Sequence, residues 1–387
     1  MLKLKKFNKY YLPTKIYFGS GILKYLPDIL ETKGERVYLV VGKHVLKDKT
    51  FKKVKDSFPK IKIKVFSKIP PKPNVTQIEN VRHLIRDFGT DLIIAIGGGS
   101  VLDTAKSAAI LANNKGTLID FLTKKRKLNK KGISFIAIPT TAGTGSEVTP
   151  WATIWGENKI KYSLSSPLMF PLAAICDPRL TLSMPPFLTA CTGLDVLSQA
   201  TEAYWSIHST PFSDIHAAQG MSLAINNLEN AVKKPKELFY REQMMLATIE
   251  TGQAFSQTAT TAVHSVSYPM TAFFNIPHGH ACALTLSMFL KYNYDVTGKD
   301  CNDKRGPEFV KKKIMEVVKN LGCNTVNEAC NKINGVMKSI GLETSLSKVG
   351  ITDVETIIKH GLTSNKVANN PRFVTKKILR KLLEKIY

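Results

Sequence analysis

Short β-rich runs alternate with helix-like segments between residues 36 and 180, and this alternation constrains the fold more than any other feature. The runs are rich in branched and aromatic residues and have the length of single strands. Segments 74–88 and 100–112 lie between runs and have helical character. Because parallel strands need a crossover connection, usually a helix, the pattern predicts an α/β domain with a mostly parallel sheet. The runs are "RVYLVVG" (36–42), "KIKVFS" (62–67), "DLIIAIGGG" (91–99), "ISFIAIPTT" (133–141) and "AAICDP" (173–178).

The β-rich runs stop near residue 181, and the rest of the chain has the pattern of an all-α domain. A chain of 387 residues is too long for one small core, so we expect two domains. "SMPPF" (183–187) marks a boundary between a domain of residues 1–182 and one of residues 183–387. The expected helices of the second domain include 187–207, 213–232, 239–258 and 277–292.

The net charge of +25 favours acidic partners, but the basic residues carry no nucleic-acid signature. Lys and Arg outnumber Asp and Glu by 55 to 30, and they are spread along the chain. The one dense run, "TKKRKLNKK" (123–131), lies between apolar segments and is typical of a solvated loop. No zinc-finger or RRM motif accompanies it. We therefore expect no nucleic-acid partner, although a positive surface would attract a small anionic substrate.

The longest apolar runs are far shorter than a membrane span, so no membrane partner is expected. Six cysteines are scattered without a CxxC pair, which indicates neither a zinc ribbon nor a disulfide framework. We expect the cytoplasm, a reducing compartment.

Three glycines, Gly97, Gly98 and Gly99, follow the apolar strand of "DLIIAIGGGSVLDTAKSAAI" (91–110). Glycine permits close approach of the backbone, and the N–H groups at a helix start suit a phosphate. Ser100, with Asp103 three residues later, predicts a capping box. The spacing is not the GxGxxG fingerprint of an ordinary Rossmann domain. A strand-to-helix turn without a ligand is the alternative, and phosphate binding is favoured over it.

A second loop of small residues, "IPTTAGTGSEVTPWATIW" (138–155), also follows a strand. It offers hydroxyl and backbone N–H groups at the C-terminal end of that strand, where α/β sheets bind ligands. Alone it is also typical of a simple turn. Together with the first loop it predicts the other wall of a nucleotide cleft, with Thr140, Thr141, Thr144 and Ser146 as candidate cofactor-binding residues.

Asp195 and Gln199 are four residues apart in "GLDVLSQATEAYWS" (193–206), so a helix would place both on one face. His264 and His278 lie among small and apolar residues in "VHSVSYPMTAFFNIPHGHACAL" (263–284), where an imidazole needs a partner. Asp195, His264 and His278 form a set able to hold a divalent metal with open coordination positions. Gln199 leaves two interpretations open: an altered centre with a weak carbonyl ligand, or a centre that is losing its metal.

Together these segments resemble the iron-containing (group III) alcohol dehydrogenases, and the similarity extends over nearly the whole chain. The matching segments are "GGGSVLDTAKSAAI", "PTTAGTGSEVTP", "DPRLTLSMPP", "TGLDVLSQATEAYWS", "NIPHG" and "NNPR" (369–372). The resemblance implies an N-terminal nucleotide-binding α/β domain and a C-terminal helical metal-binding domain, with the active site between them. It also implies NAD(H) or NADP(H) as cofactor and one divalent metal, Fe or Zn, in an aldehyde reductase. We further expect a homo-oligomer, most simply a dimer.

The resemblance also bears on Gln199. Iron members of the family use one Asp and three His, and the first of those histidines corresponds to Gln199 here. The zinc-dependent glycerol dehydrogenase branch uses one Asp and two His, which Asp195, His264 and His278 match. The resemblance therefore implies an altered metal centre rather than an absent one.

Tyr268 stands where many alcohol dehydrogenases of this family carry a His near the nicotinamide. A phenol can donate a proton or a hydrogen bond to a substrate. Residues 255–282 and "TPWATIW" resemble the phosphonoacetaldehyde reductase branch, which implies reduction of phosphonoacetaldehyde to 2-hydroxyethylphosphonate. Lys161 is the leading cation for the anionic tail, with Ser267, Tyr268 and Thr271 as hydroxyl partners. A surface position for Lys161 is the alternative.

The cofactor preference depends on the residues after the first β-rich run. NAD-preferring relatives often place an Asp there for the ribose 2′-hydroxyl, whereas this chain has Gly42 followed by Lys43. Without the acid a 2′-phosphate is not repelled, and Lys43 can pair with it, so NADH and NADPH both stay open. Three other functions also stay open: a general short-chain alcohol or sulfoacetaldehyde reductase, a cyclising relative of the dehydroquinate synthase type, and a non-catalytic nucleotide-binding protein.

Overall fold

The computed structural model describes residues 8–29, 35–47, 49–58, 61–156 and 160–387. The chain forms two compact units. The sheet unit comprises Pro13–Pro185 and Lys234–Met245, and the helical unit comprises Met1–Leu12, Pro186–Lys233 and Leu246–Tyr387. The boundary expected between residues 182 and 183 lies just before Pro186, where the main part of the helical unit begins.

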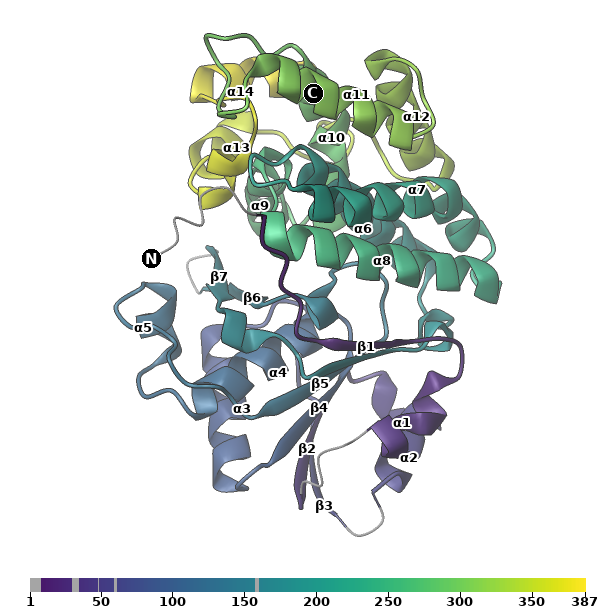
Figure 1. Cartoon of the computed structure of the whole chain (residues 1–387), viewed down its shortest axis with the longest axis vertical. Helices are drawn as coiled ribbons and strands as arrows, with labels where there is room; N and C mark the ends of the chain where they lie inside the picture. The colour runs from purple at the N-terminus through teal and green to yellow at the C-terminus, as the bar shows by residue number, and fades with distance from the viewer. Residues whose placement is uncertain (1–7, 30–34, 48, 59–60, 157–159) are drawn as a thin grey trace. The chain divides into compact units, whose positions relative to one another are not determined.

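The sheet unit is built on a six-stranded sheet in which every pair of neighbouring strands is parallel. Its strand order is β1-β8-β5-β4-β2-β3, and Figure 1 shows the twisted sheet. The strands are β1 (Lys15–Phe18), β2 (Arg36–Val41), β3 (Lys62–Phe66), β4 (Leu92–Gly97), β5 (Ser134–Pro139) and β8 (Ala173–Cys176). The expected parallel α/β domain is confirmed.

Helices cover both faces of this sheet because side chains alternate along each strand. On β2, Val37 and Leu39 enter one apolar core, whereas Tyr38 and Val40 enter another. The first core includes α1 (Leu26–Ile29) and α2 (Lys49–Asp56), and the second includes α3 (Val75–Asp87) and α4 (Gly99–Ala112). Figure 1 shows these two helix pairs on opposite sides of the sheet.

The order of the strands creates a switch point between β2 and β4. The chain places β3 on one side of β2 and then returns to place β4 on the other side. In open α/β sheets, ligands bind beyond the carboxyl ends of the strands at such a point. The backbone N–H of Gly42 donates to the carbonyl of Ile96 at 2.9 Å, so the residue that follows β2 lies beside the carboxyl end of β4 there.

A small hairpin and the first strand of the sheet were not expected from the sequence. β6 (Trp151–Trp155) pairs with β7 (Lys161–Ser165) in antiparallel register. The second loop of small residues is therefore shorter than expected, since β6 already begins at Trp151. Alternate burial along β6 is the pattern of a strand with one covered face.

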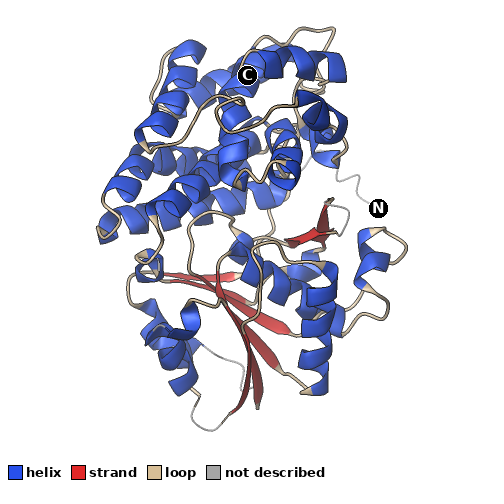
Figure 2. Ribbon diagram, turned by 180° about the vertical axis from the view of Figure 1, so that it is seen from behind, coloured by secondary structure: helices blue, strands red, loops and turns tan. Residues whose placement is uncertain are grey.

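The helical unit contains no strand among its described residues, and Figure 2 shows it as helices joined by loops. Helix α6 is buried along most of its length, so its polar side chains need partners inside the unit. None of the described helices is long and apolar enough to cross a lipid bilayer. The main helices are α6 (Pro186–Trp205), α7 (Pro211–Lys233), α8 (Leu238–Thr258), α9 (Ala262–Phe273), α10 (His278–Tyr294), α11 (Pro307–Asn320), α12 (Val326–Ser339), α13 (Val354–Gly361) and α14 (Lys376–Glu384), and the first part of α8 belongs to the sheet unit.

Candidate metal centre and nucleotide loop

One face of α6 carries three buried polar side chains at helical spacing. Asp195, Gln199 and Glu202 are 4%, 5% and 0% exposed, and residues four and seven positions apart share a helix face. The backbones of α6 and α10 approach closely beside this face. A Cβ atom on Gly279 would lie 1.8 Å from the carbonyl oxygen of Cys191, so only glycine fits at that position.

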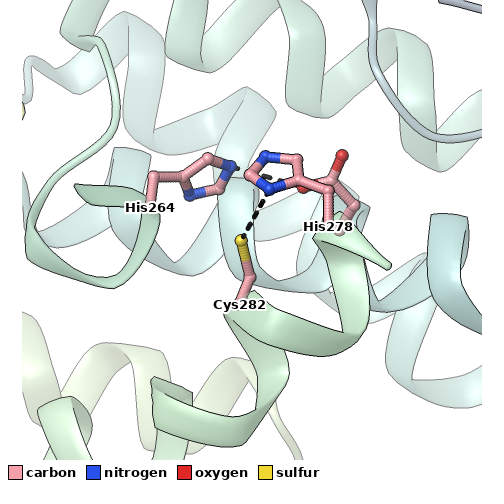
Figure 3. A group of neighbouring side chains, drawn as sticks. His264, His278 and Cys282 are labelled. Atoms are coloured by element: carbon pink, nitrogen blue, oxygen red, sulfur yellow. Dashed lines mark hydrogen bonds and ion pairs between the residues drawn. The ribbon is translucent and has the colours of Figure 1, made fainter. Parts of the chain in front are cut away.

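The two expected histidine ligands lie against Asp195. His264 comes from α9, and its Nε2 atom is 3.3 Å from Asp195 Oδ1. His278 is the first residue of α10, and the two imidazole rings meet edge to face with centroids 5.3 Å apart. Cys282, one turn after His278, completes the group, and one ligand atom from each of these four residues lies within 4.8 Å of the others. Figure 3 shows the two imidazoles and the thiol directed toward one another.

The donor atoms of this group fit a divalent metal. The buried side-chain atoms of the described residues that have no hydrogen-bond partner include three at this site: Asp195 Oδ1, Gln199 Oε1 and His264 Nε2. Asp195 Oδ1 and His264 Nε2 are close, yet their geometry does not make a hydrogen bond. Buried polar atoms without a partner are costly, and a cation would satisfy all three. Carboxylate oxygen and imidazole nitrogen are ligands that both zinc and iron accept.

Glu202 contacts the His264 ring at Nδ1, whereas the other ring nitrogen, Nε2, faces Asp195. Its carboxylate accepts hydrogen bonds from His264 Nδ1, from the His264 backbone N–H and from both the backbone N–H and the hydroxyl of Thr261. Burial by itself lowers the pKa of His264, but the charges of Cys282 and Glu202 raise it well above its usual value. With the Nδ1 proton held by Glu202, a metal would displace the Nε2 proton and take the lone pair of that nitrogen, as in carboxylate–histidine–metal arrangements.

Tyr268 lies beside this centre, with Lys366 next to it. The Tyr268 ring centroid is 5.7 Å from that of His278, and Lys366 Nζ is 5.4 Å from the Tyr268 centroid. Burial raises the pKa of Tyr268 well above its usual value, so the protonated phenol is strongly favoured. Burial lowers the pKa of Lys366, whereas the charges of Glu202, Cys282 and Asp195 act in the opposite direction.

Two of the expected hydroxyl partners are also on α9. Ser267 Oγ donates to the His264 carbonyl at 2.8 Å and lies 3.3 Å from His278 Nδ1. Thr271 is buried on the same helix. His280, the third histidine of this segment, contacts the Glu343 carbonyl through Nε2 at 2.7 Å and is outside the metal group.

In the sheet unit, the three glycines stand where β4 turns into α4. Gly98 is the N-cap of α4, and no described side chain caps it. The N–H groups of Val101 and Leu102 donate to the Gly98 carbonyl, and those of Gly99 and Ser100 at the helix start are the ones that suit an anion such as a dinucleotide phosphate. Cβ atoms on Gly97 and Gly99 would lie 2.6 Å from Val101 and Thr144, which explains why both positions are glycine.

The expected capping box of Ser100 and Asp103 is wrong. Ser100 Oγ donates to the Pro71 carbonyl, and the helix begins one residue earlier than expected, at Gly99. Asp103 accepts hydrogen bonds from Ser146 Oγ at 2.6 Å and from the Thr153 N–H at 2.8 Å. The carboxylate thus ties α4 to the second loop and to β6 instead of capping its own helix.

The second loop packs directly on the first. Thr140 N–H donates to the Gly97 carbonyl at 3.0 Å, and Thr141 and Thr144 cover Gly98 and Gly99. Buried Lys106 anchors the far end of the loop through the Ser146 carbonyl and hydroxyl and the carbonyls of Thr149 and Trp151. The structure thus brings the two expected cofactor-binding loops together.

The remaining expected residues lie at the edges of the sheet unit. Gly42 follows β2 at the switch point, and Lys43 beside it is exposed. Lys161 is the first residue of β7 and is half-buried. Its charge is one of several influences that lower the pKa of Asp103, which burial raises overall.

Sequence reasoning missed three residues of the metal centre. Glu202 continues the helical spacing of Asp195 and Gln199, so that spacing was sufficient to indicate it. Cys282 follows His278 by four residues, one helical turn, so helical spacing was sufficient to indicate it too. Lys366 has no such pattern, because it is brought to Tyr268 from a distant 3₁₀ turn, Asn365–Asn369.

The chain matches two models of known protein families. Residues 13–178 match the model described as "Iron-containing alcohol dehydrogenase". Residues 189–387 match the model described as "Fe-containing alcohol dehydrogenase family, C-terminal". Together the two matches span most of both units.

Individual relatives agree with these matches. The NADPH-dependent butanol dehydrogenase of Clostridium saccharobutylicum is 32% identical, with 98% of each chain covered. The phosphonoacetaldehyde reductase of Streptomyces viridochromogenes is 32% identical, with 77% of each chain covered. Among solved structures, sulfoacetaldehyde reductase from Bifidobacterium kashiwanohense in complex with NAD+ is 31% identical, with a TM-score of 0.88 and 98% of each chain covered.

Proposed function

Because the chain belongs to the iron-containing alcohol dehydrogenase family, we propose that it reduces a small anionic aldehyde to its alcohol. The family consists of NAD(P)-dependent alcohol dehydrogenases and aldehyde reductases that use a divalent metal. Within it, we propose phosphonoacetaldehyde as the substrate and 2-hydroxyethylphosphonate as the product. The relative from Streptomyces viridochromogenes, a phosphonoacetaldehyde reductase, supports this choice.

The reaction adds a hydride to the carbonyl carbon and a proton to the carbonyl oxygen. Asp195, His264 and His278 would hold a divalent metal, which when bound would supply a Lewis acid for the carbonyl oxygen. The start of α4 would bind the phosphates of the reduced dinucleotide, whose nicotinamide would supply the hydride. The buried Tyr268 phenol supplies a hydrogen-bond donor to the substrate, because its raised pKa keeps it protonated.

The observation that carries the anionic substrate is the ammonium group of Lys366 beside Tyr268. A partly buried cation next to a metal centre discriminates strongly in favour of an anionic group, since its charge is poorly screened by water. Lys161 of the sheet unit is a second candidate for the same role. Either cation would pair with phosphonate oxygens by charge-assisted hydrogen bonds.

A sulfonate is the specific alternative to a phosphonate. The solved structure of a sulfoacetaldehyde reductase, 31% identical to this chain, favours it as a second candidate. The two substrates share a two-carbon aldehyde and an anionic tail, and they differ in the charge of that tail. An uncharged short-chain aldehyde, as the butanol dehydrogenase relative suggests, is the third possibility.

The test compares kcat/KM for phosphonoacetaldehyde, sulfoacetaldehyde and propanal, with NADH and NADPH as reductants. We expect phosphonoacetaldehyde to exceed propanal by roughly a thousandfold, about 4 kcal/mol of transition-state binding. An uncharged aldehyde would leave the buried cation without its partner, which is why it should be rejected.

Lys366→Ala and Lys161→Ala identify the cation, and the exposed Lys291→Ala of α10 is the control. The variant that removes the pairing lysine should lower the ratio of kcat/KM for phosphonoacetaldehyde to kcat/KM for propanal. It should do so by slowing the phosphonate reaction and not the propanal reaction. Equal rates on propanal and phosphonoacetaldehyde would contradict the anionic substrate. Absence of cofactor oxidation with every aldehyde would contradict the reductase itself and favour a nucleotide-binding protein.

A further inference from the structure

Two helices each present a pair of donor side chains, spaced four residues apart, to the same buried place. Helix α6 contributes Asp195 and Gln199, and α10 contributes His278 and Cys282. The close approach of these helices at Gly279 brings the pairs together, and His264 enters from α9. The Cys282 thiol is fully buried and directed at the two imidazoles, as Figure 3 shows.

We propose that the Cys282 thiolate is a direct ligand of the metal, which makes the centre Asp-His-His-Cys. The inference rests on the metal centre of the proposed reductase and adds a sulfur ligand to it. Binding replaces the S–H bond of Cys282 by a sulfur–metal bond, and the proton leaves to solvent. No oxidation or reduction accompanies this step.

The distances support sulfur in the ligand set. Cys282 Sγ lies 4.0 Å from His278 Nδ1, and the four ligand atoms are within 4.8 Å of one another. Bond lengths of about 2.3 Å to sulfur and about 2.0–2.1 Å to nitrogen place neighbouring ligand atoms of a tetrahedral ion roughly 3.5 Å apart. Side-chain rotations that move these atoms by about 1 Å therefore close the site.

Two further observations favour Cys282 over Gln199 as the fourth ligand. A thiolate is a far stronger ligand for zinc than a neutral amide oxygen. The thiol faces the ring of His278, whose Nδ1 atom also contacts the Ser267 hydroxyl, so the sulfur is directed at a polar group rather than only at packing side chains. Cys191 is also buried, on α6 one turn before Asp195, but it is outside the ligand group. It therefore serves as the control cysteine in the experiments below. A soft sulfur ligand predicts a preference for zinc or cobalt over harder divalent ions.

X-ray absorption of the zinc-loaded full-length protein tests the proposal without relying on activity. We expect one sulfur scatterer at about 2.3 Å beside nitrogen and oxygen scatterers at about 2.0–2.1 Å. The cobalt-loaded protein should show a sulfur-to-cobalt charge-transfer band in the near ultraviolet. Both features should be lost in Cys282→Ala and retained in the matched control Cys191→Ser.

Zinc affinity gives a second measurement. Cys282→Ala should weaken zinc binding by roughly tenfold or more, since a direct ligand should matter at least as much as a residue that orients one. Gln199→Ala should weaken it less. A wild-type protein that binds zinc with only nitrogen and oxygen scatterers would overturn the cysteine ligand and leave the proposed reductase standing. A wild-type protein that binds neither zinc nor cobalt would overturn both.

Discussion

At the scale of single residues, the centre depends on how Glu202 orients His264. Glu202 is fully buried and surrounded by four hydrogen-bond donors, so its position in the fold is fixed. The hydrogen bond to Nδ1 selects the tautomer in which Nε2 faces Asp195. A carboxylate that orients a metal-binding imidazole also raises its basicity.

Glu202→Gln should therefore weaken divalent-metal binding without removing a ligand. We expect the dissociation constant for zinc to rise about 10- to 100-fold, measured by competition with a chelator. Glu250→Gln is the matched control, because Glu250 pairs with His216 at 2.7 Å in the same unit, outside the metal group. Equal zinc affinities in the Glu202 and Glu250 variants would show that the carboxylate does not act on the metal.

At the scale of elements, a buried charge cluster joins α4 to the loop that covers it. Lys106 and Glu147 are buried in the sheet unit, and Asp103 beside them is half-buried. Burial lowers the pKa of Lys106 to about 8 and raises that of Glu147 to about 7. The cluster holds the second loop against the glycines, and its charges make the stability of the sheet unit depend on pH.

Glu147→Gln should remove part of this dependence. Because the folded pKa of Glu147 is about 7, above its ordinary 4.5, the folded state binds more protons than the unfolded state between these values. The contribution of Glu147 to stability is thus fully present below pH 4.5 and is lost as the pH rises through about 7.

Denaturant unfolding of the wild type and of Glu147→Gln at a series of pH values measures this effect. We expect the variant to gain stability relative to the wild type as the pH rises, on the order of 3 kcal/mol by pH 8. A difference between the two proteins that stays constant from pH 4.5 to pH 8 would contradict the buried ionisation of Glu147.

Elements that carry periodic apolar patterns could be predicted from the sequence. Features that depend on contacts between residues far apart in the chain could not. β4, α4, α6 and α10 follow from their patterns, and so do the positions of Asp195 on a helix and of His278 at the start of one, whereas α9, which carries His264, was not among the expected helices. Ser100 and Asp103 have the spacing of a capping box, but the carboxylate makes hydrogen bonds with Ser146 and Thr153, far along the chain. β1 and Lys366 were missed for the same reason, since their partners are distant in sequence.

At the scale of the whole molecule, the positive charge of the chain bears on the choice of cofactor. The carboxyl end of β2 lies at the switch point of the sheet and presents Gly42 and the exposed Lys43 instead of an acid. A dinucleotide with a 2′-phosphate would meet a cation at Lys43, and positions 42 and 43 hold no acid.

Lys43→Ala should accordingly raise KM for NADPH more than KM for NADH. Loss of one partly solvated ion pair with the 2′-phosphate should raise the ratio of KM for NADPH to KM for NADH by roughly tenfold, about 1.4 kcal/mol. Steady-state kinetics with both cofactors measures the ratio, and the exposed Lys47→Ala nearby is the control. Identical changes in the two KM values would place the 2′-phosphate elsewhere.

The central claim is that a divalent metal on Asp195, His264 and His278 is required for aldehyde reduction. The most direct test strips the wild-type protein with a chelator, restores zinc, and follows NAD(P)H oxidation with phosphonoacetaldehyde while bound metal is counted. We expect activity to be lost on stripping and to return as about one ion binds per chain. His264→Ala should retain its fold by circular dichroism but neither bind the ion nor oxidise the cofactor. Full activity in the metal-free protein, or undiminished metal content in His264→Ala, would contradict the account.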